Sequence, residues 1–370
     1  MKNIVIIFLG KFSSDARCQN MASSILKSTN YKLSIICLND ENVDNQIFNK
    51  INFYYLNISK IKFYKYYDFY KKTKTILKKA RFDIVIAADL YSLASCKSNK
   101  NQKLIYDCRE IYTELEAHIN KPFYKFFWKY YEKYYLKFVD KVMVTATSDK
   151  LFMQKNYSNH SHLSYRIIYN YPKYEKYTKK NLLHKKFKIN QKFKIILYQG
   201  VIQSGRGILK LIKFINQNQE YKAVIIGDGN QKLNYINHVK INNDENNVFF
   251  MNAVPYNDLF QYTASADVGW LMLSKQSVSN QFALPNKLFE YILMGLPIIS
   301  SNINNIKKII DDFPIGVIIN NEDDFSEIKQ GLDLILKLNS NALHNIAKNN
   351  FVWGGKNSVE ADFLKIIDAK

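Results

Sequence analysis

The chain has 370 residues, which corresponds to about two domains of ordinary size. Hydrophobic residues make up 47% of it, which excludes a wholly disordered chain, and no apolar run approaches the roughly 20 residues of a membrane-spanning helix. The formal net charge of +21 favours a partner that carries negative charge, although the codon usage of an AT-rich genome would also produce many lysines.

The first ten residues, MKNIVIIFLG, predict a β-strand rather than a signal peptide, because the apolar stretch is short and no small-residue cleavage site follows it. Strands are also expected at 31–38, 51–57, 83–87, 103–107 and 142–147. After residue 193 a second series follows: FKIILYQG, YKAVIIG, NVFFM, ADVGWLML, PIISS and IGVII. Apolar strands separated by helical stretches are typical of parallel sheets covered on both faces. The sequence therefore predicts an α/β protein with two doubly wound, Rossmann-like domains.

The segment between the two series is polar and basic, so we expect a linker at 176–193, between domains at 1–175 and 194–352. Residues 1–175 carry a net charge of +14, from 29 basic and 15 acidic residues. The remainder carries +7, so the first domain is the better candidate to meet an anionic surface. Four scattered cysteines without CxxC spacing argue against a zinc module or a disulfide framework and are typical of the cytoplasm.

The most informative segment is 279–301, SNQFALPNKLFEYILMGLPIISS. Pro285 suits the start of a helix, and Gly295 is expected to stop it. Lys287 and Glu290 are three residues apart, so they share a face near its N-terminus. The helix dipole and Lys287 predict an anion site, and Glu290 is placed to bind a sugar diol. An ordinary helix with a surface Lys–Glu pair is the alternative.

Two glycine-rich turns precede this helix: YQGVIQSGRGI, with Gly205 and Arg206, and VIIGDGNQ, with Gly227. Glycines let the backbone approach a ligand closely, and the guanidinium of Arg206 can bind phosphate as a planar fork. Neither turn is a full GxGxxG fingerprint or a P-loop, which argues against NAD enzymes and NTPases.

These blocks, in this order, resemble the family-4 (group 1) glycosyltransferases of the GT-B fold, in particular their subgroup with an LPNK–FEY block. The run VPYNDLFQYTASADVG and, in the first half, SSDARCQNMASSIL, AADLYSLASC, LIYDCREIYTE and RIIYNYPKY resemble further blocks of that family. The resemblance implies two sheets that face a central cleft and a C-terminal helix, 353–370, that crosses back to the first domain. It also implies transfer of a sugar from a nucleotide-sugar, UDP- or GDP-linked, to a hydroxyl with retained anomeric configuration.

The resemblance assigns roles to matched positions. Arg206 and Lys287 would bind the diphosphate, Glu290 the ribose, and the backbone of 252–255 would face the base. In the first domain, Asp89, Arg109 and Glu110 would lie near the sugar and the acceptor, with Arg206 completing the catalytic set. The full set of expected donor-binding residues is Gly10, Lys11, Gly205, Arg206, Gly227, Val254, Leu284, Pro285, Asn286, Lys287 and Glu290.

Two positions depart from the family pattern. Phe282 stands where the family often has the first Glu of Glu-x7-Glu, so another group must contact the donor sugar. Arg109 replaces the His of the D-x-H-E block, and Arg cannot act as a neutral base at ordinary pH. Arg109 could instead stabilise phosphate or an anionic sugar, and His118 is a candidate substitute base. The absence of a D-x-D motif predicts that neither a metal nor another cofactor is required.

Residues 121–138, KPFYKFFWKYYEKYYLKF, combine regularly spaced lysines with aromatic residues. Such a helix suits the headgroup region of an anionic membrane, and 58–81 is a second candidate. The expected surface comprises Lys121, Lys125, Trp128, Lys129 and Lys133. Alternatively, the aromatic residues of both helices pack on the sheet of the first domain. No RNA-binding motif accompanies them, so no nucleic-acid partner is expected.

The predicted function is therefore a metal-independent hexosyltransferase that modifies a cell-surface polysaccharide or a lipid-linked glycan. We expect it in the cytoplasm, with peripheral attachment to the inner face of the membrane if the basic helices dock there. A nucleotide-sugar 2-epimerase of the same fold and an inactive scaffold subunit of a glycosylation complex are the alternatives.

Overall fold

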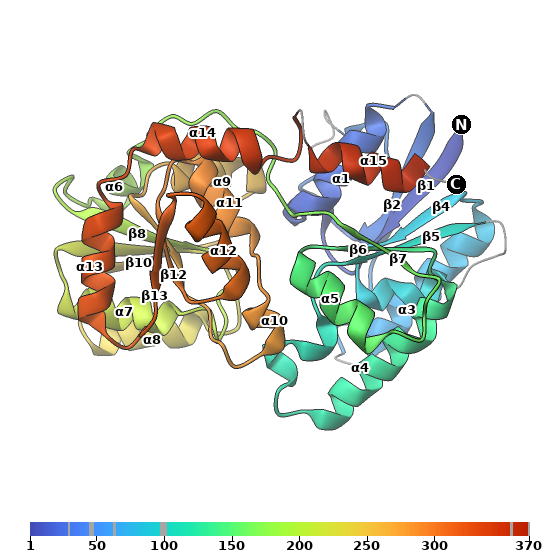
Figure 1. Ribbon diagram of the computed structural model, residues 1–370, viewed down its shortest axis with the longest axis horizontal. Helices are drawn as coiled ribbons and strands as arrows, with labels where there is room; N and C mark the ends of the chain where they lie inside the picture. Colours follow the sequence, from blue (N-terminus) through green and yellow to red (C-terminus); the bar gives the residue numbers. More distant parts are fainter. Residues whose placement is uncertain (29, 44–47, 62–63, 97–101, 356–357, 369–370) are drawn as a thin grey trace. The chain divides into compact units, whose positions relative to one another are not determined.

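The computed structural model describes the chain apart from residues 29, 44–47, 62–63, 97–101, 356–357 and 369–370. Its contacts divide the chain into two compact units (Figure 1). The first unit is Met1–Asn170 together with Trp353–Lys370, and the second is Tyr171–Val352. None of the described helices is long and apolar enough to cross a membrane.

The first unit is built on a parallel seven-stranded sheet in the order β3-β2-β1-β4-β5-β6-β7. Its central strands are nearly continuous runs of buried apolar residues, as expected for a sheet covered on both faces. The strands are β1 (Lys2–Ile7), β2 (Tyr31–Leu38), β3 (Asn52–Leu56), β4 (Ile84–Ala87), β5 (Lys103–Cys108), β6 (Lys141–Val144) and β7 (Ser164–Ile167). The α-helices described are α1 (Ala16–Leu26), α3 (Tyr64–Lys79), α4 (Pro122–Tyr135), α5 (Thr147–Asn156) and α15 (Val359–Asp368).

The second unit contains a parallel six-stranded sheet in the order β10-β9-β8-β11-β12-β13. Its strands are β8 (Lys194–Gln199), β9 (Tyr221–Ile226), β10 (Val248–Met251), β11 (Val268–Leu271), β12 (Ile298–Ser301) and β13 (Gly316–Ile319). Its helices are α6 (Leu182–Phe187), α7 (Ile208–Gln217), α8 (Lys232–Ile241), α9 (Tyr256–Thr263), α10 (Val278–Gln281), α11 (Asn286–Leu293), α12 (Asn304–Asp312), α13 (Phe325–Ile335) and α14 (Ser340–Asn350). Two hydrophobic clusters, one on each face, cover the sheet.

The predicted fold class, two doubly wound parallel sheets, is confirmed. In each sheet the first strand along the chain is an interior strand: β1 pairs with both β2 and β4, and β8 pairs with both β9 and β11. The strand order reverses between β1 and β4 in the first sheet and between β8 and β11 in the second. The loops that follow the two strands of each pair therefore lead away in opposite directions. In open α/β sheets ligands bind at such switch points, at the carboxyl ends of the strands.

Two segments differ from the sequence-based expectation. The short strand β7 was not predicted, because its side chains are only partly buried and show no clear apolar run. The expected linker 176–193 contains α6, and Leu183 and Ile189 are buried in the core of the second unit. A few apolar anchors therefore hold this polar, basic segment in place.

The C-terminal segment packs within the first unit, where α15 lies beside α1 (Figure 1). The Trp353 indole Nε1 donates to Ser24 Oγ at 2.8 Å, and this hydroxyl donates to Glu360 Oε1, also at 2.8 Å. Lys27 forms an ion pair with the same carboxylate at 2.6 Å. These contacts hold the C-terminal segment against the N-terminal part of the first unit.

Candidate active site

Helix α11 lies in the second unit and presents the predicted Lys–Glu pair. Pro285 occupies the N-cap position, one residue before the helix, and Gly295 follows the helix with φ of +68°, a conformation that favours glycine. Glu290 is only 5% exposed and Lys287 is partly buried. The alternative of an exposed surface pair is therefore wrong, and no ion pair joins these two side chains among those found in the described residues.

Three polar side chains orient the Glu290 carboxylate. Gln199 Nε2, at the end of β8, donates to Glu290 Oε2 at 2.7 Å, and the Tyr256 hydroxyl donates to Oε1 at 3.1 Å. Thr263 Oγ1 donates to Gln199 Oε1 at 2.8 Å, which fixes the amide so that its NH2 faces Glu290. Burial raises the pKa of Glu290, and these two hydrogen bonds oppose the rise. Each carboxylate oxygen retains a lone pair for a further donor.

Lys287 and Arg206 place two cations close together at the β8/β11 switch point. The ammonium of Lys287 lies 3.8 Å from the centre of the Tyr198 ring. Burial and the positive charge of Arg206 hold the pKa of Lys287 well below its ordinary value, and Glu290 counteracts this only in part. Among the described residues, neither cation forms an ion pair. With the Gln203 amide oxygen turned toward it, Arg206 donates to that oxygen from Nη2 at 3.0 Å.

The loop after β8 holds Arg206 in place through backbone contacts. The Gly205 carbonyl accepts from the Ser274 amide at 2.9 Å, and the Gly207 carbonyl accepts from Trp270 Nε1 at 3.0 Å. Gly207 has φ of +67°, and a Cβ there would lie 2.5 Å from Met272 Cβ. Glycine is therefore required for this loop to pack against the segment after β11.

The second glycine-rich turn is tied to the expected base-facing loop. Gly227 approaches Gly200 so closely that a Cβ would lie 1.9 Å from the Gly200 carbonyl oxygen. Lys232 Nζ donates to Asn252 Oδ1 and Asp228 Oδ1, both at 2.6 Å, and Asp228 Oδ2 accepts from the Ala253 amide at 3.0 Å. These contacts fix the segment that contains Val254. Leu284, like Val254, packs against the core below α11.

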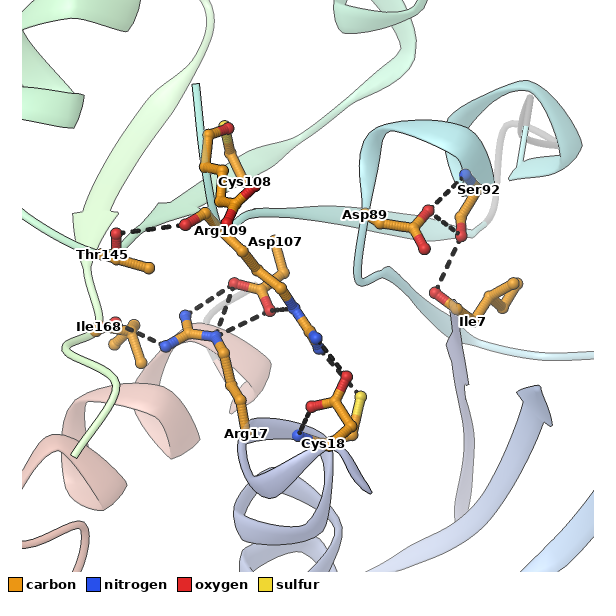
Figure 2. Close-up of polar contacts among 12 residues, drawn as sticks. Ile7, Arg17, Cys18, Asp89, Ser92, Asp107, Cys108, Arg109, Thr145 and Ile168 are labelled. Atoms are coloured by element: carbon orange, nitrogen blue, oxygen red, sulfur yellow. Dashed lines mark hydrogen bonds and ion pairs between the residues drawn. The ribbon is translucent and has the colours of Figure 1, made fainter. Parts of the chain in front are cut away.

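In the first unit, Asp89 connects the loops at the β1/β4 switch point. Its Oδ2 accepts from the Leu9 amide at 2.6 Å. Its Oδ1 accepts from the Ser92 amide and hydroxyl at 2.8 and 2.7 Å, as Figure 2 shows. Burial raises the pKa of Asp89, and the hydrogen bonds oppose this. The side chain thereby positions the turn with Gly10 and Lys11, of which Lys11 is exposed.

Arg109 belongs to a buried cluster of charges rather than projecting alone (Figure 2). Its Nε donates to Asp107 Oδ2 at 3.0 Å, its Nη1 pairs with Asp15, and its Nη2 donates to Cys18 Sγ at 2.9 Å. Arg17 binds the other side of Asp107, with Nη2 2.7 Å from Oδ1. Since guanidinium has five N–H groups, two remain for a ligand. The catalytic role of Arg109 stays a prediction.

The other candidates in the first unit lie apart from this cluster. Glu110 is exposed, directly after Arg109. His118 is buried, its Nδ1 is 3.0 Å from the Tyr112 carbonyl, and its ring packs edge-on against Tyr124 at 4.8 Å. Burial lowers the pKa of His118. These contacts favour a structural role for His118.

Helix α4 differs from the expected division into a basic and an aromatic face. Trp128 is 5% exposed and lies in the core, so its assignment to the outer surface is wrong. Lys121, Lys129 and Lys133 are exposed, whereas Lys125 pairs with Glu114 at 2.5 Å. The exposed aromatic residues are Phe123, Phe126, Phe127 and Tyr130. Aromatic residues surround the helix, and only some of them pack on the sheet.

The residues that orient the candidate ligand groups are not predicted by any pattern in the sequence. Gln199 lies within the quoted YQG block, but its partner Glu290 is 91 residues away. Tyr256, Thr263 and Lys232 carry no spacing signal of their own. Among the described residues, no three His, Cys, Asp or Glu side chains gather as a metal site.

Comparison with known proteins identifies the class. Residues 179–353 match the family model described as "Glycosyl transferases group 1". The second unit is therefore similar to group 1 glycosyltransferases over almost its whole length, and the predicted class of enzyme, a glycosyltransferase, is confirmed. A search of curated proteins found no match.

Solved structures share the fold over the whole chain. Sucrose-phosphate synthase from Thermosynechococcus elongatus is 14% identical, with a TM-score of 0.76 over 99% of this chain and 98% of that one. WaaG, a glycosyltransferase involved in lipopolysaccharide biosynthesis, is 15% identical, with a TM-score of 0.73 over 99% and 100%. Anabaena HepE, solved in complex with UDP-glucose, is 12% identical, with a TM-score of 0.72 over 100% of each chain. These TM-scores establish the GT-B fold, while the particular subgroup stays a prediction.

Proposed function

We propose that this protein is a metal-independent, retaining glycosyltransferase that takes a sugar from a nucleoside diphosphate sugar. The observation that carries the proposal is the pair of cations, Lys287 and Arg206, at the switch point of the second sheet. Two neighbouring positive charges repel each other, and burial adds to the cost of the Lys287 charge. A diphosphate carries two negative charges at neutral pH and would relieve both costs.

The remaining contacts of the donor follow from the second unit. The N-terminus of α11 adds its dipole to the two cations. Glu290, held by Gln199 and Tyr256, can accept from the two ribose hydroxyls through its remaining lone pairs. We assign the base to the loop that Lys232 holds through Asn252. Solved HepE binds UDP-glucose on the same fold, which supports this class of donor.

The proposed reaction forms a bond between the acceptor oxygen and the anomeric carbon while the bond from that carbon to the phosphate oxygen breaks. The proton of the acceptor hydroxyl moves to the departing phosphate oxygen on the same face of the sugar. Negative charge grows on the diphosphate as the bond breaks, and Arg206 and Lys287 bind the transition state more strongly than the ground state. This route needs no protein base, which is consistent with arginine at position 109.

We further propose that the acceptor is a lipid-linked or cell-envelope glycan and that the first unit docks on an anionic membrane. The net charge of +14 in residues 1–175 and the exposed lysines of α4 support this. A relative in fold, WaaG, is involved in lipopolysaccharide biosynthesis, which supports the same class of acceptor.

The experiment that tests the proposal is a turnover assay with purified protein, a panel of nucleotide-sugars and EDTA. We expect release of nucleoside diphosphate and transfer to an added lipid-linked glycan, both greatly reduced in Glu290→Ala. Exposed Glu245→Ala is the matched control and should behave like the wild type. Epimer formation without acceptor would make the protein a 2-epimerase. Binding without any turnover would make it a scaffold.

Donor binding is expected to raise the pKa of Lys287, because a diphosphate stabilises the charged ammonium. At pH values above the lowered free-state pKa the protein should take up a proton on binding, and donor affinity should be greatest below that pKa and fall as the pH rises through it. Calorimetry in buffers of different ionisation enthalpy measures this proton. A sugar-linked diphosphate has no group that titrates near neutral pH, so the donor itself contributes none. Equal uptake in Lys287→Arg, which stays charged, would contradict the assignment.

Charge reversal on α4 tests membrane docking separately. We expect Lys121→Glu, Lys129→Glu and Lys133→Glu together to abolish sedimentation with anionic vesicles, since each lysine near such a surface contributes about 1 kcal/mol. Donor affinity should be unchanged, because none of these lysines belongs to the expected donor-binding residues. The matched control replaces Lys213, Lys240 and Lys308, exposed residues of the second unit. Equal vesicle binding by both triple variants would contradict docking through α4.

A further inference from the structure

The first unit contains an aromatic cavity that the proposed donor site does not use. It has a volume of about 700 Å3 and lies between α3, the 3-10 helix η2 (Leu90–Cys96) and α4. Ten aromatic side chains and Ala94 line it. Ligand cavities commonly have volumes of this order and predominantly apolar walls.

The wall of this cavity is deeply packed on one side and open on the other. Trp128 is 5% exposed and meets Tyr66 and Tyr91 edge-on, with ring centres 5.4 and 5.1 Å away. Phe123 and Phe127 also line the cavity but are 90% and 56% exposed. Large aromatic side chains left in water next to a cavity are typical of a binding surface.

Polar and charged groups at this cavity favour an amphiphile over a purely apolar ligand. The ammonium of Lys65 lies 4.8 Å from the centre of the Tyr66 ring, and Lys74 donates to the Tyr70 hydroxyl at 2.5 Å. Two lysine ammonium groups therefore contact aromatic residues of the cavity wall.

The positive charge of helices α3 and α4 favours an amphiphile with a negatively charged head group. Helices α3 and α4 together contain nine lysines and two acidic residues. Asp68 is paired with Lys72 at 3.1 Å, and Glu132 is buried, where it accepts from two tyrosine hydroxyls. Lys125 pairs with Glu114 at 2.5 Å, and among the described residues the lysines of these two helices other than Lys72 and Lys125 form no ion pair, so they suit a negatively charged head group.

We propose that this cavity takes one hydrocarbon chain of an anionic lipid, with the lipid phosphate among the lysines of α3 and α4. Burying a chain gains about 0.8 kcal/mol per CH2 group, and the lysines add electrostatic attraction. Only the biological role of this lipid binding rests on the proposed function: the cavity would hold the lipid part of a lipid-linked acceptor at the enzyme. The binding itself requires no sugar transfer.

Tryptophan fluorescence tests the proposal. Vesicles of phosphatidylglycerol with brominated acyl chains should quench Trp128, and the quenching should be lost in Trp128→Phe. Trp270, in the core of the second unit, is 0% exposed, and Trp353, which packs against Phe363, is 2% exposed, so both should retain their emission. Absence of quenching, or equal quenching by neutral phosphatidylcholine vesicles, would overturn the proposal.

Two matched double variants separate the cavity from simple contact of α4 with the bilayer. Phe123→Ser with Phe127→Ser removes two residues of the cavity wall, whereas Phe126→Ser with Tyr130→Ser removes two exposed aromatic residues of the same helix outside it. We expect loss of Trp128 quenching only in the first variant. Equal loss in both would show that α4 merely inserts into the interface and would overturn the proposal. Donor affinity, measured by calorimetry in the same variants, reports independently on the proposed function.

Discussion

Arg206→Ala is expected to lower the rate of sugar transfer by about two orders of magnitude or more, the scale of losing one charge-stabilising donor in other enzymes. Arg206 has no carboxylate partner among the described residues, so its guanidinium is available for the departing diphosphate. The loss should appear mainly in kcat, because the charge that Arg206 stabilises grows as the glycosidic bond breaks.

Two further variants sharpen this prediction. Arg206→Lys keeps the charge but loses the planar fork, so we expect an intermediate rate. Arg81→Ala removes an exposed arginine of the first unit and should leave the rate unchanged. Wild-type kcat in Arg206→Ala would remove this residue from the catalytic set.

Asp107→Asn is expected to destabilise the first unit by about 3–5 kcal/mol, the usual cost of breaking a buried ion pair. Asp107 is 0% exposed and accepts hydrogen bonds from Arg17 and Arg109 (Figure 2). The neutral amide would leave the Arg17 guanidinium buried without a countercharge. Urea unfolding, followed by the emission of Trp128 and Trp353 in that unit, measures the loss.

The pH dependence of the unfolding free energy provides a second test of this prediction. Burial tends to raise the pKa of Asp107, but the charges of Arg17 and Arg109 outweigh it and hold the pKa below its usual value. A depressed folded-state pKa adds stability above the unfolded pKa of about 3.9, and this is lost as the pH falls through the folded value. The variant should lack this acid-dependent loss. Asp362→Asn breaks an exposed pair with Lys365 and should change nothing measurable.

The strands and helix ends that depend on a local sequence pattern could be predicted from the sequence. Apolar runs predicted all six strands of the second sheet, and Pro285 and Gly295 indicated both ends of α11. Local pattern failed where a strand has no apolar run, as in β7 with the sequence SYRI, and where isolated residues such as Leu183 are buried within a polar segment.

The parts of the site that escaped prediction depend on contacts between distant residues. Arg109 stood out only as a replacement for histidine, but Asp15, 94 residues away, and Cys18, 91 residues away, contact its guanidinium. Gln199 and Glu290 lie on different elements, so no spacing relates them. Trp128 was placed on the wrong side of its helix because aromatic residues surround that helix and hide its inner face.

The central claim is that the second unit binds a nucleoside diphosphate sugar through cationic side chains. Isothermal calorimetry with UDP-, GDP-, ADP- and CMP-sugars in EDTA tests it most directly. We predict saturable binding of a diphosphate-linked sugar to the wild type and loss of that binding in Arg206→Ala combined with Lys287→Met. Binding to neither protein, or equal binding to both, would contradict the account.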